Sequence, residues 1–259
     1  MECVDLNSDI GEGFGVYKMG DDGAILECVS SANVACGWHA GDALIMEGMA
    51  QKARDLGVGL GAHVGYPDLL GFGRRKMEIS PKEARCYTLY QIGALEAFAK
   101  SCGFALQHVK LHGSFYHQTS SDPNLARAIL EGISAYNPKL IVLTLSQSLM
   151  AIEGLKMGLC VAQEAFIDRH YLASGQLVPR SHPQALIGDV SYALERALKM
   201  ITECKVRTLE GTEIEIKAHS LCVHGDNPKA LEFAKQIRTG LEKHGITIRP
   251  LRSILGFPH

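Results

Sequence analysis

The sequence lacks the marks of most nucleotide-binding, secreted and membrane-spanning proteins. No Gly-Lys-Ser or Gly-Lys-Thr occurs, so the chain carries no Walker A phosphate loop. No uninterrupted apolar stretch approaches the roughly 18 residues that a membrane-spanning helix needs. The acidic start, MECVDLNSDIGEG, has neither the basic nor the apolar region of a secretory signal peptide. We therefore expect a cytoplasmic protein.

Clustered charge is absent as well. The chain has 26 Lys and Arg against 28 Asp and Glu, a formal net charge of −2, and no run of like charges. A balance this close to neutral gives no electrostatic ground for binding nucleic acid or an anionic membrane. We therefore expect neither nucleic acid nor a membrane as a partner.

The eight cysteines show no C-x-x-C spacing. Cysteines scattered in this way along a long chain indicate reduced thiols, which agrees with a cytoplasmic location. We expect them to be mostly buried, where cysteine behaves as a small apolar residue.

What the sequence does contain is a repeated unit of a short apolar run, a polar cluster and a helical pattern. The apolar runs predict strands at residues 3–9, 32–36, 58–64, 108–112, 140–145, 159–164 and 220–224. Helix-capping signals lie between them: Ser80 and Pro81 open one pattern, with Glu83 three residues after the cap, and Gly57 ends another. Strands alternating with helices form parallel βαβ units. Seven units, or eight with residues 246–251, predict an α/β fold with one domain, residues 1–259, shaped as a distorted (β/α) TIM-like barrel.

Two segments do not fit this unit. The stretch VRTLEGTEIEIKA alternates polar and apolar residues around Glu210-Gly211, which predicts a β-hairpin near residues 206–217, inserted before the seventh strand. The stretch GYPDLLGFGRRKMEIS, residues 65–80, is long, basic and rich in glycine. Segments of this kind often cover a site, so we expect it to act as a lid.

Polar residues follow nearly every predicted strand, in the clusters DLNSD, GWHAGD, GAH, KLHG, QEAFIDR and VHGD. Barrel enzymes place their chemistry at the carboxyl ends of the strands, which share one mouth. Side chains alternate along a strand, so Asp5, Asn7 and Asp9 share one face of the first strand. Lys110 and His112 likewise share one face of the fourth strand. Burying such groups costs several kcal/mol unless they are paired or used. The sequence therefore predicts a polar barrel interior that opens on an active site.

Some polar residues have a structural interpretation instead. Asp42 is a candidate cap for the helix that follows it, and Asp122 and Asn227, each before a proline, are interpreted as caps. The glycines in residues 57–61 are more typical of close packing than of a dinucleotide site, because no strand-turn-helix context surrounds them.

Eight blocks of the sequence resemble the signature blocks of the LamB/YcsF family, which supplies the A subunit of prokaryotic 5-oxoprolinase. The blocks are DLNSDIGEGFG, SANVACGWHAGD, GAHVGYPDLLGFGRR, LYQIGALEAFA, HVKLHGSFYH, EAFIDRHY, LVPRS and CVHGD, in order over nearly the whole chain. Two positions depart from the family: Trp38 stands where Phe is usual, and Leu111 where Pro is usual. Neither change removes a polar candidate.

The resemblance implies a barrel related to the glycoside hydrolase/deacetylase superfamily. It implies ATP-dependent opening of the 5-oxo-L-proline lactam to glutamate, carried out together with the B and C subunits of 5-oxoprolinase. ATP is then a co-substrate, with Mg²⁺ on the complex. The polar barrel mouth and the absence of a nucleotide-binding motif in this chain agree with a reaction that is shared with other subunits.

With that reaction in view, the candidates divide into two sets. The candidate catalytic residues are Asp5, Asn7, Asp9, His39, His63, Lys110, His112, Glu164 and His224. The candidate substrate-binding residues are Glu12, Trp38, Arg74, Asp168, Arg180 and Asp226. A carboxylate (Asp9, Glu164 or Asp5) acts as general base or orients one.

The other candidates transfer protons, neutralise negative charge or position groups by hydrogen bonding. The histidines His39, His63 and His224 move protons or hold the developing oxyanion. The cations neutralise a substrate carboxylate or a phosphoryl group, and they are Lys110, Arg74 and Arg180. Asn7 and His112 position groups by hydrogen bonding. We expect Lys110→Ala or Asp9→Asn to abolish turnover and to leave folding nearly intact.

Two alternatives stay open. The chain could be a stand-alone metal-dependent amide or acetyl hydrolase, with ligands such as Asp9, His39 and His63 drawn from different strands. It could also be a non-catalytic subunit that presents the substrate to its partners. The sequence leaves open whether a metal is bound and which way the rings of Trp38 and His39 point.

Overall fold

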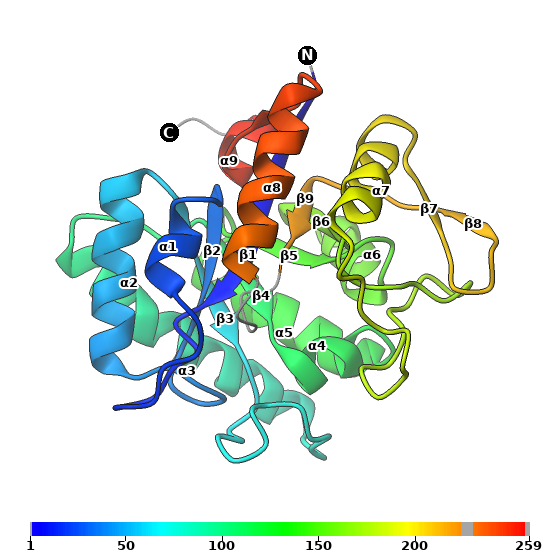
Figure 1. Ribbon diagram of the computed structural model, residues 1–259. Helices are drawn as coiled ribbons and strands as arrows, with labels where there is room; N and C mark the ends of the chain where they lie inside the picture. The colour runs from blue at the N-terminus through cyan, green and yellow to red at the C-terminus, as the bar shows by residue number, and fades with distance from the viewer. Residues whose placement is uncertain (1, 224–229, 257–259) are drawn as a thin grey trace.

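A closed barrel of parallel strands forms the centre of the computed structural model, which describes residues 2–223 and 230–256 (Figure 1). Its strands are β1 (Cys3–Ile10), β2 (Ser31–Ala35), β3 (Gly59–Val64), β4 (His108–Leu111), β5 (Ile141–Leu145), β6 (Val161–Phe166) and β9 (Ser220–Cys222). Each strand pairs with the next in this order, and β9 pairs with β1 to close the ring. The predicted TIM-like barrel is therefore confirmed, with seven strands in the described part of the chain.

The helices surround this barrel in the order of the chain (Figure 1). They are α1 (Asp22–Leu26), α2 (Ala43–Leu56), α3 (Pro81–Ser101), α4 (Gly113–Thr119), α5 (Pro123–Tyr136), α6 (Leu149–Lys156), α7 (Val190–Thr202), α8 (Ala230–Lys243) and α9 (Leu251–Ile254). Ser80 and Glu83 form a capping box on α3, and Asp42 caps α2 by accepting from the backbone N–H groups of Leu44 and Ile45. The predicted helix starts are thus confirmed at both positions. Asn227 lies outside the described residues.

Alternation along β1 separates the two environments of the barrel. Val4 and Leu6 are fully buried in the hydrophobic core between strands and helices. Asp5, Asn7 and Asp9 point the other way, into the barrel, where they bond to side chains of other strands. A smaller apolar cluster closes part of the interior, formed by Ile141, Leu143, Ala162 and Leu251. The polar interior expected from the sequence is therefore confirmed, with an apolar portion at β5 and β6.

The expected hairpin is present, and the eighth unit differs from expectation. Strands β7 (Lys205–Arg207) and β8 (Glu213–Glu215) pair in antiparallel fashion and extend beyond α7 (Figure 1). Strand β10 (Thr247–Ile248) pairs only with the start of β1, at Cys3 and Val4. It adds no strand to the barrel, because the ring is closed by the pairing of β9 with β1.

Two further expectations concern cysteines and glycines. All eight cysteines are free, but only Cys28, Cys36 and Cys222 are buried, so the expectation of mostly buried thiols is wrong. Gly59 and Gly61 do permit close packing, because a Cβ atom at either would collide with the side chain of Gln107 or His108. Among the described residues, no helix is long and apolar enough to span a bilayer.

Candidate active site

The carboxylate of Asp5 is a buried acid of the barrel interior. It is fully buried and accepts hydrogen bonds from Ser30 Oγ at 2.7 Å, from Ser31 Oγ at 2.6 Å and from Ser220 Oγ. Burial raises the pKa of Asp5 to about 6, although the three hydroxyl groups oppose the shift. Asp5 is therefore enclosed by serines below the site and does not reach the cavity described below.

A pair of asparagines forms the next layer. Asn7 Nδ2 donates to Ser220 Oγ at 2.6 Å, which fixes the amide so that Asn7 Oδ1 faces upward as an acceptor. Asn33 Nδ2 donates to Asn7 Oδ1 at 2.8 Å and to Asp9 Oδ1 at 2.9 Å. Both amides are fully buried. Asn33 orients the Asp9 carboxylate directly, and Asn7 holds Asn33 in turn.

Lys110 connects the two carboxylates of this region. Its Nζ atom lies 2.9 Å from Asp9 Oδ1 and 3.0 Å from Glu164 Oε2. Burial alone would lower the pKa of the Lys110 ammonium, but the adjacent carboxylates, Asp9 foremost, raise it well above its usual value. The second oxygen of Glu164 accepts from Tyr116 at 2.7 Å. Glu164 is therefore engaged on both oxygens and holds Lys110 as a fixed cation.

Three histidines and a glutamate lie on the other side of Asp9. His63 Nε2 is 3.3 Å from Asp9 Oδ2 and 2.9 Å from His112 Nδ1. The rings of His39 and His112 stack with centroids 3.7 Å apart and planes 4° apart. Glu12 Oε1 lies 3.4 Å from His39 Nε2, 3.3 Å from His112 Nδ1 and 3.8 Å from His63 Nε2. Burial lowers the pKa of His39 and of His112 well below the usual value, so both rings are neutral.

The segment of residues 65–80 covers this cluster, as expected from its composition. The Phe72 carbonyl faces His112 Nε2 at 2.9 Å, and the Gly73 carbonyl accepts from the backbone N–H of Ser114 at 2.9 Å. An ion pair between Arg75 and Asp68 holds the segment in its bend. The contact with His112 means that this covering segment also fixes a site residue.

The turn from β2 into α2 settles the orientation of two rings. Gly37 and Gly41 both have positive φ, at 88° and 78°, and the Gly37 N–H donates to the Ala40 carbonyl at 2.8 Å. His39 points inward and is fully buried. Trp38 stacks on Tyr90 with centroids 5.2 Å apart, and its ring packs edge-on against Tyr87 at 4.7 Å. Trp38 therefore packs on α3 and does not line the cavity.

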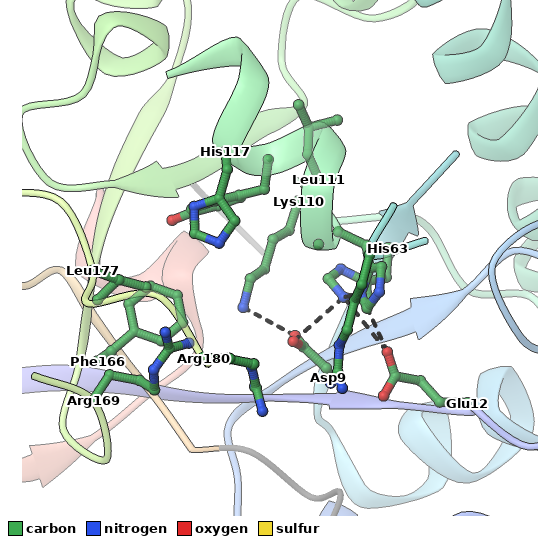
Figure 2. A pocket seen from close by; sticks show the side chains of 14 residues that line it. Asp9, Glu12, His63, Lys110, Leu111, His117, Phe166, Arg169, Leu177 and Arg180 are labelled. Atoms are coloured by element: carbon green, nitrogen blue, oxygen red, sulfur yellow. Dashed lines mark hydrogen bonds and ion pairs between the residues drawn. The ribbon is translucent and has the colours of Figure 1, made fainter. Parts of the chain in front are cut away.

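A cavity opens above Asp9 (Figure 2). Its lining residues are Asp9, Glu12, His63, Arg74, Lys110, Leu111, His112, Gly113, Tyr116, His117, Phe166, Arg169, Leu177 and Arg180. Lys110, Arg74, Arg169 and Arg180 give the wall a strongly cationic character, while Asp9 and Glu12 supply carboxylates at one side. The cavity is thus suited to a small anion held beside a carboxylate.

The structure brings seven of the predicted site residues to this cavity: Asp9, Glu12, His63, Arg74, Lys110, His112 and Arg180. His39 stacks behind His112, and three others lie beneath the floor, namely Asp5, Asn7 and Glu164. Asp168 lies just beyond β6 and is not among the lining residues. His224 and Asp226 fall outside the described residues, so their predicted roles stay predictions.

Sequence reasoning missed several residues of the site. Tyr116 bonds to Glu164 and lines the cavity, yet a tyrosine inside a short helix gives no sequence signal of its own. The i, i+4 spacing from His112 is the one clue that it faces the same mouth. Arg169 is buried and donates a hydrogen bond to the Val178 carbonyl at 2.6 Å. Its side chain also lines the cavity. Asn33 was visible only as a polar residue within an apolar strand.

The geometry permits one kind of chemistry in particular. Asp9 lies between a fixed ammonium group and a histidine, at the border of a cationic cavity. A carboxylate in this position can accept a proton from a water molecule, while the cations stabilise negative charge on the group under attack. Asp5 and Glu164 are enclosed by their hydrogen-bond partners. Of the three expected general bases, Asp9 is the one with access to a substrate.

Comparison with known proteins gives one consistent answer. The model of the LamB/YcsF family matches residues 4–256. The A subunit of 5-oxoprolinase from Fusobacterium nucleatum subsp. nucleatum is 54% identical over 96% of this chain and 96% of its own length. The crystal structure of a lactam utilization protein from Thermus thermophilus superposes with a TM-score of 0.90 at 45% identity, covering 96% of this chain and 99% of that one.

A more distant likeness concerns the fold alone. A deacetylase solved with its substrate superposes with a TM-score of 0.53 at 12% identity, covering 99% of this chain and 92% of that one. The barrel therefore shares its fold with a known deacetylase.

Proposed function

This chain belongs to the LamB/YcsF family, and from that premise we propose that it is the A subunit of a 5-oxoprolinase. The complete enzyme, formed with B and C subunits, opens the lactam of 5-oxo-L-proline to L-glutamate with hydrolysis of ATP. The name of the relative from Fusobacterium nucleatum, at 54% identity, supports the substrate, and the cavity supports the placement of the reaction in this chain.

One observation carries the proposal: the Asp9 carboxylate lies beside Lys110 and His63 at the floor of a cavity walled by arginines. The substrate is a small ring with one carboxylate, which suits a cavity with guanidinium groups on its wall. Arg74 is held over the Phe72 ring at 4.9 Å, so its position is defined before the substrate arrives. We assign the carboxylate of the substrate to Arg74 and Arg180.

The reaction needs ATP because an amide carbonyl is a poor electrophile. Transfer of the γ-phosphoryl group to the lactam oxygen releases ADP and makes the ring carbon reactive. Water then adds to that carbon and gives its proton to Asp9, the C–N bond breaks as the nitrogen takes up a proton, and an acyl phosphate results. A second water hydrolyses the acyl phosphate to glutamate and phosphate. Lys110 and the arginines stabilise the negative charge on the oxygens throughout.

The test is reconstitution of the complex. This chain is mixed with B and C subunits, and formation of glutamate and of ADP is measured with 5-oxoproline and MgATP. We expect both products in equal amounts, and their rate of formation lowered by about 10²–10⁴-fold with Asp9→Asn. Absence of ADP and glutamate from the wild-type complex would overturn the proposal. Full turnover by the Asp9→Asn complex would instead make this chain the non-catalytic presenting subunit.

A second candidate function rests on the three histidines and Glu12 beside Asp9. Such a cluster also suits a stand-alone metal-dependent amide or acetyl hydrolase. That function predicts hydrolysis of N-acetylated substrates by the isolated chain, without ATP, and loss of this activity on addition of a chelator. The isolated chain should be inactive in this assay if the 5-oxoprolinase proposal is correct.

A further inference from the structure

The donor atoms of Glu12, His39, His63 and His112 converge on one point at the side of the cavity. One ligand atom from each residue lies within 4.8 Å of every other, and all four side chains are buried. His63 lies at the carboxyl end of β3, and the other three follow a strand: Glu12 follows β1, His39 follows β2 and His112 follows β4. Four successive strand exits therefore supply one donor each.

The spacing of these atoms is that of a coordination sphere. Zn–N distances of roughly 2.0–2.1 Å place the donors of a tetrahedral site about 3.3 Å apart. The separations from Glu12 Oε1 are 3.3, 3.4 and 3.8 Å, and His63 Nε2 lies 2.9 Å from His112 Nδ1. Small rotations of the side chains would equalise these distances.

His39 is the strongest sign that something is bound here. The side chain is fully buried, yet neither ring nitrogen has a hydrogen-bond partner within residues 2–223 and 230–256. Buried polar atoms are nearly always satisfied, because leaving one without a partner costs about 1–3 kcal/mol. The Nε2 atom faces Glu12 Oε1 at 3.4 Å, within the cluster. An ion at that point would satisfy it.

The orientation of His112 is that of a metal ligand. Its Nε2 atom lies 2.9 Å from the Phe72 carbonyl, which can only accept, so Nε2 carries the hydrogen. In the neutral ring the lone pair is then on Nδ1, which faces Glu12 and His63. Metal-binding histidines commonly donate their other N–H to a backbone carbonyl, which fixes the tautomer and the ring. The covering segment of residues 65–80 supplies that carbonyl.

From these contacts we propose that Glu12, His39, His63 and His112 bind one divalent transition-metal ion at the side of the cavity. Three imidazoles and one carboxylate favour Zn²⁺ or a similar ion over Mg²⁺ and Ca²⁺, which prefer oxygen ligands. The ion would be next to Asp9, whose Oδ2 atom already contacts His63 at 3.3 Å. The proposal adds to the proposed function and is independent of it, because binding is a property of this chain alone.

The experiment measures binding by the purified full-length chain after dialysis against a chelator. ZnSO₄ is titrated calorimetrically, MgCl₂ serves as the comparison, and CoCl₂ is added to record the visible absorption of the bound ion. We expect one Zn²⁺ per chain, no comparable binding of Mg²⁺, and cobalt bands typical of nitrogen ligation. Zn²⁺ should also raise the melting temperature, because it binds the folded chain.

Variants locate the ion. Glu12→Gln, His39→Ala and His63→Gln should each weaken Zn²⁺ binding by more than the roughly 10–100-fold typical of changes outside the ligand set. His182→Ala, at an exposed histidine away from the cluster, should bind as the wild type does. Melting curves in chelator show which variants fold. If His39→Ala does not, the nearly isosteric Glu12→Gln carries the test.

Two results would overturn the metal site: a folded wild-type chain that binds no Zn²⁺, or unchanged binding in Glu12→Gln and His63→Gln. The outcome is separable from that of the proposed function. A chain that binds Zn²⁺ while the reconstituted complex leaves 5-oxoproline intact retains the metal site and loses the function. A chain that binds no Zn²⁺ but turns over 5-oxoproline in the complex retains the function and loses the metal site.

Discussion

The Nζ atom of Lys110 lies 2.9 Å from Oδ1 of Asp9, and the Lys110 side chain is only 2% exposed. Glu164, which is fully buried, contacts the same ammonium at 3.0 Å. This arrangement corrects one sequence-based expectation, that Lys110→Ala would leave folding nearly intact. Removing the cation would leave a buried carboxylate without its counter-charge, which typically costs about 3–5 kcal/mol.

We therefore predict two effects of Lys110→Met, which retains the length of the side chain. The free energy of unfolding should fall by about 3–5 kcal/mol, and turnover by the complex should be abolished. Urea denaturation and the glutamate assay measure the two effects. Lys156→Met is the matched control, because Lys156 is 67% exposed and its ion pair with Glu153 lies on the surface. Equal stability of the two variants would contradict the prediction.

Asp9→Asn should separate chemistry from stability. Asp9 is 12% exposed at the edge of the cavity, and an amide at this position can still accept from Lys110 and Asn33. Loss of a general base typically lowers the rate by 10²–10⁴-fold, so we expect turnover to fall by about that factor. Steady-state kinetics of the complex measure it, and circular dichroism checks the fold. Turnover within a few-fold of wild type would remove Asp9 from the mechanism.

Trp38→Phe should leave turnover and KM unchanged. The Trp38 ring packs on Tyr87 and Tyr90, and such aromatic pairs contribute roughly 0.5–1.5 kcal/mol each, so the variant should lose stability of that order. Because Trp38 is the one tryptophan of the chain, its fluorescence also tests the assignment directly. Addition of 5-oxoproline should not alter the emission. A change in KM, or quenching by the substrate, would place Trp38 at the substrate.

Gly73→Ala should disrupt the stacked histidines. Gly73 has a φ of 62°, and a Cβ atom there would lie 2.8 Å from both His39 Cβ and His112 Cδ2. Gly57→Ala is the control, since Gly57 has a φ of 68° with nothing within 4 Å of the added atom. Both variants carry similar backbone strain. We expect only Gly73→Ala to lose turnover and the cobalt spectrum, and equal behaviour of the two would show that the histidine contact is unimportant.

Asp5 predicts how stability depends on pH. Its folded-state pKa is about 6, above the unfolded value of 3.8, so the folded chain retains a proton that the unfolded chain releases. The contribution to stability is fully present below pH 4 and is lost as the pH rises to 6. At 1.36 kcal/mol per pH unit, the loss is about 3 kcal/mol.

Urea denaturation at several pH values measures this dependence in the wild type and in Asp5→Asn. The variant should show a flatter profile between pH 4 and 6, whatever its overall stability. Asp22 also has a pKa raised to about 6, mainly by burial, so part of the slope will remain in the variant. Parallel profiles for the two proteins would show that Asp5 is not the titrating group.

The sequence predicted features that depend on neighbouring residues. Alternation along β1 placed Asp5, Asn7 and Asp9 inside the barrel, and capping chemistry located the starts of α2 and α3. These succeed because side-chain direction in a strand and the free N–H groups of a helix are local properties.

What the sequence could not predict depends on contacts between distant segments. The inward position of His39 is set partly by the covering segment, through the Gly73 and Phe72 contacts with His39 and His112. The hydrogen bond of Tyr116 to Glu164 joins residues 48 positions apart. The sequence proposed Asp9, His39 and His63 as a possible ligand set, whereas the geometry places Glu12 and His112 with the two histidines.

The closure of the barrel by β9 and β1 explains where a buried acid can be accommodated. Residues that are paired in register on neighbouring strands point to the same face of the sheet, so closing the ring brings interior side chains of the last strand beside those of the first. At the β9–β1 seam Asp5 is in register with Ser220, and the two side chains bond directly. An eighth strand inserted at that seam would separate them by a further strand spacing of about 4.8 Å. The shielded carboxylate thus depends on the direct pairing of β9 with β1, and a barrel closed by another strand at this point would need a different partner for Asp5.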